Sequence, residues 1–206
     1  MAYRDTPALS ARRLARREQL LQESEWLLRE GGFAGLTMQG LADRAGVSVG
    51  ALYRHFPSKQ ELAAEVFRRA TEREVAAVQA ALEQHQYAAA QVQAAAEQFI
   101  QRALKAPRQA WALIAEPVDP AVDEERLRYR EAYAALFRRV IEAGMARGEL
   151  PWQVPAVSAA ALVGALAEAL VGPLAGPPSK AVTAPLIAFC LRAVGAPSAF
   201  TEESAS

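Results

Sequence analysis

Side chains that can bind a nucleic-acid backbone are concentrated between residues 37 and 59. Tyr53, His55 and Lys59 carry donors that can reach phosphate oxygens, and the hydroxyl of Thr37 can do the same. Arg54 has a planar guanidinium that could pair with a phosphate or with the edge of a guanine. Contacts of this kind need the donors to stand along one surface, which a pair of short helices can provide.

The segment 37–56 has the layout of a helix-turn-helix. Thr37 can accept an N–H of the first helical turn, and Gly46 can adopt the left-handed conformation that ends a helix. Ser48 is a second N-cap, and the second helix is expected over residues 49–56. The apolar face of the first helix consists of Met38, Leu41, Ala42 and Ala45.

A second helix in this position could lie in the major groove of DNA. Gly50 lowers helix stability by about 1 kcal/mol relative to alanine, which makes sense where a sugar-phosphate chain approaches the backbone closely. Because strong hydrogen-bonding groups are few at this tip, DNA shape could carry much of the specificity. The candidates for base reading are Gln39, which could read adenine, Val49 and Ala51, which could contact a thymine methyl, and Ser48 and Gly50.

Four arginines cluster at the start of a helix expected over residues 10–30 and stopped by Gly31 and Gly32. A run of charge is often only a solvated face. Since these arginines precede a DNA-reading unit, contact with phosphates or the minor groove is favoured here. The cluster consists of Arg12, Arg13, Arg16 and Arg17, and Trp26, off the apolar stripe of the same helix, is expected to pack on the second domain.

The stretch TMQGLADRAGVSVGALYRHFPSK resembles the TetR family of one-component bacterial transcriptional regulators. The resemblance extends upstream through Arg16-Arg17-Glu18-Gln19 and Gly32-Phe33, so it covers roughly residues 10–65. It implies phosphate contacts for Thr37, Tyr53, His55 and Lys59. The alternative for the whole segment is that the two helices only pack together in a helical protein and do not bind DNA. The alternative for Tyr53 and His55 is that they are partly buried packing residues.

Composition predicts an all-α protein of 206 residues with 52% hydrophobic residues, much of that alanine. The formal net charge is zero, but residues 1–60 hold nine Lys or Arg against six Asp or Glu. A basic N-terminal part fits nucleic-acid contact by that part alone. Cys190 is the only cysteine, and no signal peptide is apparent, so a cytoplasmic location is expected.

Two parts and about nine helices are expected, with a DNA-binding domain at residues 1–58 and a ligand-sensing and dimerising domain at 59–206. Asp119 can cap a helix that has Pro120 at its first position. Gly172 and Pro173 are expected to break another, and Ser179 to cap the last. The further helices are expected over residues 59–84, 88–105, 108–116, 120–147, 156–172 and 180–194.

The helices expected at 156–172 and 180–194 are nearly devoid of charge, with only Glu168, Lys180 and Arg192. Helices that are apolar around most of their circumference must be covered on several sides. A partner subunit is the natural cover, and the family resemblance also implies a homodimer through the last two helices. Packing within one subunit is the alternative. The apolar run 154–175 is interpreted as a buried helix, not a membrane span, because it contains Glu168 and mostly alanine.

The sequence offers little catalytic chemistry. His55, His85 and Cys190 have no metal-ligand spacing, so no catalytic residue, metal or cofactor is expected and the protein is interpreted as not an enzyme. The resemblance implies a ligand pocket in the second domain, and the few buried polar residues favour an apolar or amphipathic small molecule. The candidate contacts are Phe99, Trp111, Tyr133, Phe137 and Arg130, each of which could instead be a core or solvated residue.

Together these features predict a ligand-responsive regulator that binds a palindromic double-stranded operator as a homodimer and is released by a small-molecule effector. Repression is expected from the resemblance alone. Two other classes stay open. A helical protein-interaction adaptor would lack salt-dependent affinity for DNA, and a small-molecule-binding protein would bind its ligand independently of DNA.

Overall fold

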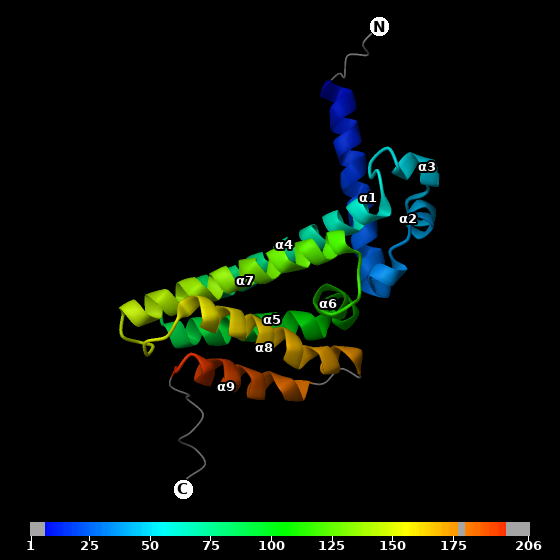
Figure 1. Cartoon of the computed structure of the whole chain (residues 1–206). Coiled ribbons are helices and arrows are strands. Elements are labelled where there is room, and N and C mark those ends of the chain that lie inside the picture. Colours follow the sequence, from blue (N-terminus) through cyan, green and yellow to red (C-terminus); the bar gives the residue numbers. More distant parts are fainter. Residues whose placement is uncertain (1–6, 177–179, 197–206) are drawn as a thin grey trace.

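The computed structural model describes residues 7–176 and 180–196, with side chains from residue 10 onward, and this part of the chain is all-α (Figure 1). It forms nine α-helices and one short 3₁₀-helix, without strands. The elements are α1 Pro7–Gly35, α2 Met38–Ala45, α3 Val49–Leu52, α4 Lys59–Glu83, α5 Ala88–Lys105, α6 Pro107–Ile114, α7 Pro120–Ala146, α8 Pro155–Ala175, η1 Lys180–Val182 and α9 Thr183–Ala193.

The first three helices, the start of α4 and a few residues of α6 and α7 enclose one hydrophobic core. The residues up to 58 are called the head below. Apolar residues of α1 and α2 meet Leu52 and Phe56, which follow the turn at Gly46. Each of these side chains is almost completely removed from water, which is the main favourable contribution to folding. The largest buried members are Leu20, Leu28, Leu36, Leu41, Leu52, Phe56, Leu62 and Phe67.

The long helix α4 joins the head to the remaining helices, which are called the body below (Figure 1). Its N-terminal half buries Leu62 and Phe67 in the head core, and its C-terminal half buries Val78 and Leu82 in the body core. Ser58 caps it by accepting a hydrogen bond from the Glu61 amide at 3.0 Å. α4 thus belongs to both cores, and α7 does so too, because its Val122 lies in the head core and its Tyr133 in the body core.

The body packs α5, α7, α8 and α9 around a second core. In Figure 1 α4 and α7 run side by side from the head, with α5, α8 and α9 below them. Asp119 begins α7 as expected, because its carboxylate accepts the Ala121 amide at 3.1 Å and Pro120 occupies the first helical position. Gly144 lets α7 approach the start of α5 closely, since an added Cβ would lie 2.6 Å from that of Ala88.

Several expected boundaries were wrong. The first helix begins at Pro7 and reaches Gly35. Gly32 interrupts it with φ 67°, so the helix is broken at a glycine that was expected to end it. The short helical segment after Gly32 was not predicted. α3 ends at Leu52 instead of residue 56, and the chain continues as a turn to Phe56. Pro173 lies inside α8 and does not break it, whereas Ser179 lies outside the described residues.

Trp26 packs within the head, not on the body. The guanidinium of Arg44 in α2 stacks over its indole ring at 3.6 Å from the ring centroid. Arg44 also forms an ion pair with Glu23 of α1. The tryptophan therefore fastens α2 to α1 through a cation–π contact, and it remains 44% exposed.

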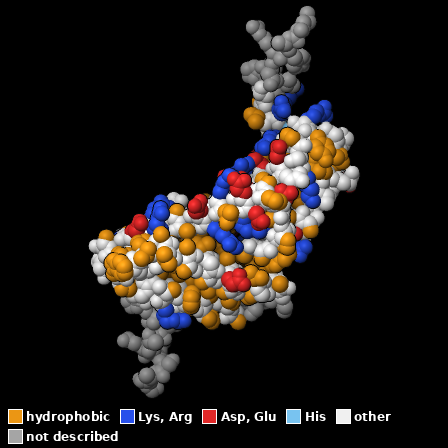
Figure 2. Space-filling model, in the orientation of Figure 1, with side chains coloured by type: hydrophobic (Ala, Val, Ile, Leu, Met, Phe, Trp, Pro, Cys, Tyr) orange, Lys and Arg blue, Asp and Glu red, His pale blue; other side chains and the backbone are white. Residues whose placement is uncertain are grey.

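The helices α8 and α9 keep apolar side chains on the outside of the molecule. Figure 2 shows hydrophobic side chains along the lower part of the body, over α8 and α9, while charged side chains gather higher, over α4 and α7. Val157 and Phe189 are exposed, although Leu162, Leu166 and Leu170 of α8 are buried. α8 is long and apolar enough to cross a membrane, with mean hydropathy 1.8, but one such helix is weak evidence for a membrane span.

Candidate nucleic-acid interface and effector pocket

The helix-turn-helix is fixed by local hydrogen bonds. The Thr37 hydroxyl accepts from the Gly40 amide at 3.0 Å, and the Ser48 hydroxyl accepts from the Ala51 amide at 3.2 Å. Gly46 has φ 64° and its amide bonds back to the end of α2. Because both hydroxyls act only as acceptors in these caps, each still has a proton to donate to an outside oxygen.

The residues expected to contact DNA lie around α2 and α3 with most of their side chains in water. Gln39 is exposed but already donates to Asp43 at 2.7 Å, so it must exchange that partner to reach a base. Tyr53 is 48% exposed, whereas His55 is half-buried beneath the turn that follows α3. The exposed set is Thr37, Gln39, Ser48, Gly50, Tyr53, Arg54 and Lys59, and the half-buried set is Val49, Ala51 and His55.

Gly50 stands on the open side of α3. A Cβ built at this position meets no heavy atom within 4 Å, and the backbone is not in the left-handed region. Neither packing nor conformation inside this chain therefore requires glycine. Any requirement for glycine at this position therefore comes from a molecule that approaches α3 from outside the chain.

The arginines of α1 differ in what they contact. Arg16 donates to the Ala45 carbonyl at 3.0 Å and Arg13 to the Arg54 carbonyl at 3.3 Å, so both hold α1 against the helix-turn-helix. Arg17 lies 5.0 Å from the centre of the Phe56 ring and pairs with Glu65 at 3.2 Å. Arg12 is exposed and has no ion pair among the described residues. Arg13 and Arg16 thus have a structural role besides any contact with phosphate.

Burial and the surrounding arginines both lower the pKa of His55. Burial lowers its pKa from the ordinary value of 6.5, and the positive charges of Arg13, Arg16, Arg54 and Arg17 lower it further. Its Nδ1 is buried without a hydrogen-bond partner. The imidazole is therefore neutral near pH 7 in the free head, and a nearby phosphate would favour its protonated form.

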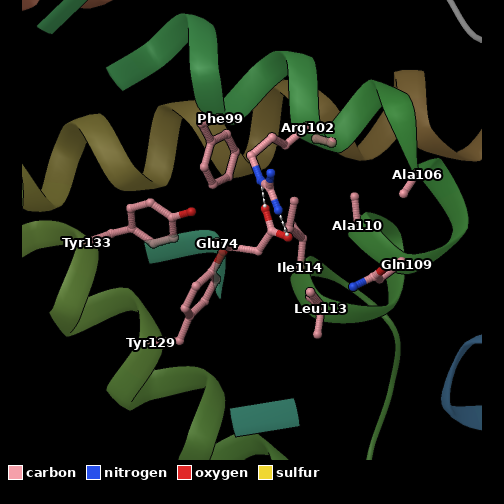
Figure 3. Close-up of a pocket in the computed structure, with 11 residues that line it drawn as sticks. Glu74, Phe99, Arg102, Ala106, Gln109, Ala110, Leu113, Ile114, Tyr129 and Tyr133 are labelled. Atoms are coloured by element: carbon pink, nitrogen blue, oxygen red, sulfur yellow. Dashed lines mark hydrogen bonds and ion pairs between the residues drawn. The ribbon is translucent and has the colours of Figure 1, made fainter. Parts of the chain in front are cut away.

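A small cavity of about 40 Å³ lies in the body between α4, α5, α6 and α7 (Figure 3). Glu74 of α4 and Arg102 of α5 form a bidentate ion pair in its wall, with Oε2–Nε 2.5 Å and Oε1–Nη2 2.8 Å. The rest of its lining is mainly apolar: Phe99, Ala103, Ala106, Gln109, Ala110, Leu113, Ile114, Tyr129 and Tyr133.

Three aromatic rings form one wall of this cavity. Tyr129 and Tyr133 meet edge to face at 4.7 Å between ring centroids, and Phe99 and Tyr133 at 5.3 Å. Burial raises the pKa of both tyrosines well above the ordinary value. Their hydroxyls therefore stay protonated at physiological pH and can donate a hydrogen bond to a ligand oxygen.

The candidate ligand contacts are distributed over different parts of the body. Phe99 and Tyr133 line the cavity, whereas Phe137 is fully buried in the core. Trp111 packs on the core beside Arg108, whose guanidinium is 5.6 Å from its ring. Arg130 lines a separate outer groove between α7 and α8. The cavity thus brings together two of the five candidates.

The head and body are joined by a buried carboxylate at the end of α6. Glu116 is 5% exposed and accepts from the amides of Phe33 at 2.8 Å and Ala34 at 3.0 Å. A Cβ at Gly32 would lie 2.5 Å from the Glu116 Oε2, so the glycine makes room for this carboxylate. Arg126 of α7 fixes the same corner by donating to the Glu116 carbonyl at 2.7 Å. We call this contact the Glu116 latch.

A family model described as bacterial regulatory proteins of the TetR family matches residues 20–66. The N-terminal part of the chain, which holds the helix-turn-helix, is therefore similar to the TetR family. The HTH-type transcriptional repressor KstR2 of Mycolicibacterium smegmatis is 39% identical over 64 residues, which are 31% of this chain and 30% of that protein. The chain therefore aligns with less than a third of the length of this curated relative.

Several solved structures share the fold over nearly the whole chain. NemR of E. coli in its reduced form has a TM-score of 0.75 at 19% identity and covers 89% of this chain and 99% of its own. FadR of Bacillus subtilis, solved with stearoyl-CoA, has a TM-score of 0.74 at 12% identity and covers 88% of this chain and 99% of its own. At these identities the likeness establishes the fold, including the arrangement of the body.

The matched TetR relatives are transcriptional regulators and not enzymes. Within residues 7–176 and 180–196 no group of three or more His, Cys, Asp or Glu side chains is arranged to hold a metal ion. Cys190 is buried, and burial raises the pKa of its thiol to about 11. Because the thiolate is the nucleophilic form, this cysteine is unreactive near pH 7.

Sequence reasoning missed Glu74, Arg102 and Tyr129 in the cavity and Glu116 in the latch. Glu74 and Arg102 are on different helices, and a charged residue on a helix is normally assigned to the solvent face. Tyr129 and Tyr133 do show a signal, since residues four apart lie on the same helix face. Glu116 precedes Pro117, and nothing local marks its carboxylate as buried.

Proposed function

We propose that this protein is a ligand-responsive transcriptional repressor that binds a palindromic DNA operator as a homodimer and is released by a small-molecule effector. The observation that carries the proposal is the exposed row of donors on a correctly capped helix-turn-helix, including Tyr53 and Lys59 beside the open backbone of Gly50. We assign Thr37, Tyr53, His55 and Lys59 to phosphates and the tip of α3 to the major groove.

The apolar outer faces of α8 and α9 support a homodimer. Val157 is 66% and Phe189 47% exposed, and both lie on helices with few charges. Exposed apolar surface of this extent on adjacent helices favours association with a second copy. Dimerisation would set two α3 helices about one DNA turn, ~34–36 Å, apart, which requires an operator with two-fold symmetry.

Ligand control follows from the position of the cavity. It touches α4, which enters the head, and α6, whose end continues into the Glu116 latch on α1. A ligand larger than the small cavity must displace α6 or α4, and it would then favour a head orientation different from the one that fits the operator. FadR, solved with stearoyl-CoA, supports a small-molecule effector for a body of this fold. Such a regulator would act in the cytoplasm, where bacterial DNA is accessible.

Selection of bound duplexes from a random pool tests the proposal without knowledge of the operator. We expect the wild-type protein to enrich a palindrome, and Tyr53→Ala and Lys59→Ala to lose that enrichment. Tyr87→Ala and Arg139→Ala are matched controls, because both residues are exposed in the body, and both should select the same palindrome as wild type. Selection of no common sequence would favour a helical adaptor or a ligand-binding protein without specific DNA recognition.

A further inference from the structure

A basic cleft lies at the junction of head and body, beside the effector cavity. Its volume is about 460 Å³, and its walls come from α1, α4, α5 and α6. Two carboxylates, Glu30 and Glu74, also line it. The cations around it are Arg29 of α1, Arg73 of α4, Arg102 and Lys105 of α5 and Arg108 of α6.

Only part of this positive charge is neutralised within the chain. Arg102 pairs with Glu74, and Arg73 forms a bidentate pair with Glu25 at 2.6 and 2.8 Å.

The other cations of the cleft are uncompensated. In the described part of the chain, Arg29 and Lys105 have no carboxylate within ion-pair distance, and Arg108 donates only to the Gly31 carbonyl, at 3.3 Å. Three cations facing one cleft, with Glu30 as their only unpaired acidic neighbour, attract an anion that carries more than one charge. Phosphate groups are such anions, and arginine matches their geometry.

The cleft and the effector cavity form adjoining parts of one site. Glu74, Arg102, Ala106 and Gln109 line both of them. The ion pair between Glu74 and Arg102 is shared by the two, and Figure 3 shows it beside the aromatic residues of the cavity. A single ligand can therefore place an apolar group in the cavity and a charged group in the cleft.

We propose that the effector is a phosphate-bearing amphiphile of the chemical class represented by short-chain acyl thioesters of coenzyme A. The acyl group enters the cavity beside Tyr129 and Tyr133, and the phosphates occupy the cleft at Arg29, Lys105 and Arg108. A cavity of about 40 Å³ has room for about three water-sized groups, which suits a short acyl chain and excludes a long one without rearrangement. The regulatory meaning of this ligand rests on the proposed function.

The cleft also explains how such a ligand would act on the head. Arg29 belongs to α1, whereas Lys105 and Arg108 belong to the body. Phosphates that bind both sides at once favour one separation of head and body over the others. The effector thus reaches the head directly through α1 as well as through α4 and the Glu116 latch.

Calorimetric titration of the full chain, without DNA, tests the ligand class. The probes are butyryl-CoA, free CoA and butyrate, in low salt and in 0.5 M salt. We expect butyryl-CoA to bind at least tenfold more tightly than either fragment, and its affinity to fall as salt rises because exposed charges are screened. Butyrate binding as tightly as butyryl-CoA, or no binding of either CoA compound, would overturn the proposal.

Charge variants test the location. Arg29→Gln and Lys105→Gln remove exposed cations that have no ion pair, so both should fold, and each should weaken butyryl-CoA at least fivefold. Arg139→Gln removes an exposed arginine of α7 outside the cleft and should leave the affinity unchanged. If all three variants bind butyryl-CoA with equal affinity, the phosphates do not occupy the basic cleft and the proposed location is wrong. Binding of butyryl-CoA by a protein that selects no DNA sequence would refute the proposed function and leave the ligand site intact.

Discussion

Several residues of the head that we propose to contact DNA also have structural roles. The hydroxyl of Thr37 caps α2 and keeps a proton for a phosphate, and Arg13 and Arg16 hold α1 against backbone carbonyls that lie beside the donor surface. Substituting such residues would affect folding and binding together. His55 and Gly50 are better test positions, because the effect of a substitution on stability can be measured separately from its effect on DNA binding.

His55 makes the stability of the head depend on pH. Its pKa is lower in the folded than in the unfolded chain, so the unfolded chain binds a proton first as pH falls below 6.5. The free energy of unfolding should be fully retained above pH 6.5 and decrease as pH falls from there through the folded pKa. Urea unfolding of wild type and His55→Gln at pH 5.5 and 7.5 measures this, and an equal decrease in both proteins would contradict the assignment.

Gly50→Ala should strengthen the helix and weaken DNA binding. The alanine methyl group meets no atom of the free protein, and the free energy of unfolding should rise by about 0.5–1 kcal/mol. On the DNA-facing side the same methyl group would obstruct the sugar-phosphate chain, and operator affinity should fall about tenfold, ~1.4 kcal/mol. Denaturation and DNA titration of one preparation provide both values, and unchanged affinity would show that nothing approaches α3 closely.

At the level of elements, helix starts marked by a capping side chain were predictable, whereas several helix ends and the contacts between helices were not. Thr37, Ser48 and Asp119 cap the helices they were expected to cap, because capping depends on residues within one turn. The end of α3 was missed because the residues after Leu52 keep a helical sequence pattern while adopting a turn. The Glu74–Arg102 pair joins residues 28 apart, which no local pattern reveals.

The Glu116 latch is the element-level device that joins head and body. Glu116→Ala would leave the buried amide of Phe33 and the part-buried amide of Ala34 without their acceptor and should lower the free energy of unfolding by about 1–3 kcal/mol. Glu116→Gln keeps one acceptor oxygen and should cost less than Glu116→Ala. Urea unfolding measures the free energy of unfolding of both variants. Hydrogen exchange at the Phe33 and Ala34 amides should be faster in Glu116→Ala than in wild type. Wild-type exchange in that variant would show that the latch does not hold the head.

For the whole molecule, the central structural expectation is a dimer through α8 and α9. Ala161→Glu introduces a charge on the exposed face of α8 and should convert the dimer to monomer without unfolding the chain. Ala76→Glu, on the exposed face of α4, is the matched control and should remain dimeric. Sedimentation measures both masses, and a dimeric Ala161→Glu protein would place the interface elsewhere.

The most direct test of the account is binding of the full chain to the DNA upstream of its own gene, measured over a series of salt concentrations with Tyr53→Ala and Lys59→Ala alongside. We predict tight binding whose affinity falls steeply as salt rises, because phosphate contacts release counterions. Both variants should bind more weakly, and Lys59→Ala should also have a smaller salt slope. Weak binding that is equal in all three proteins, without preference over random DNA and without a sequence selected from random duplexes, would contradict the account.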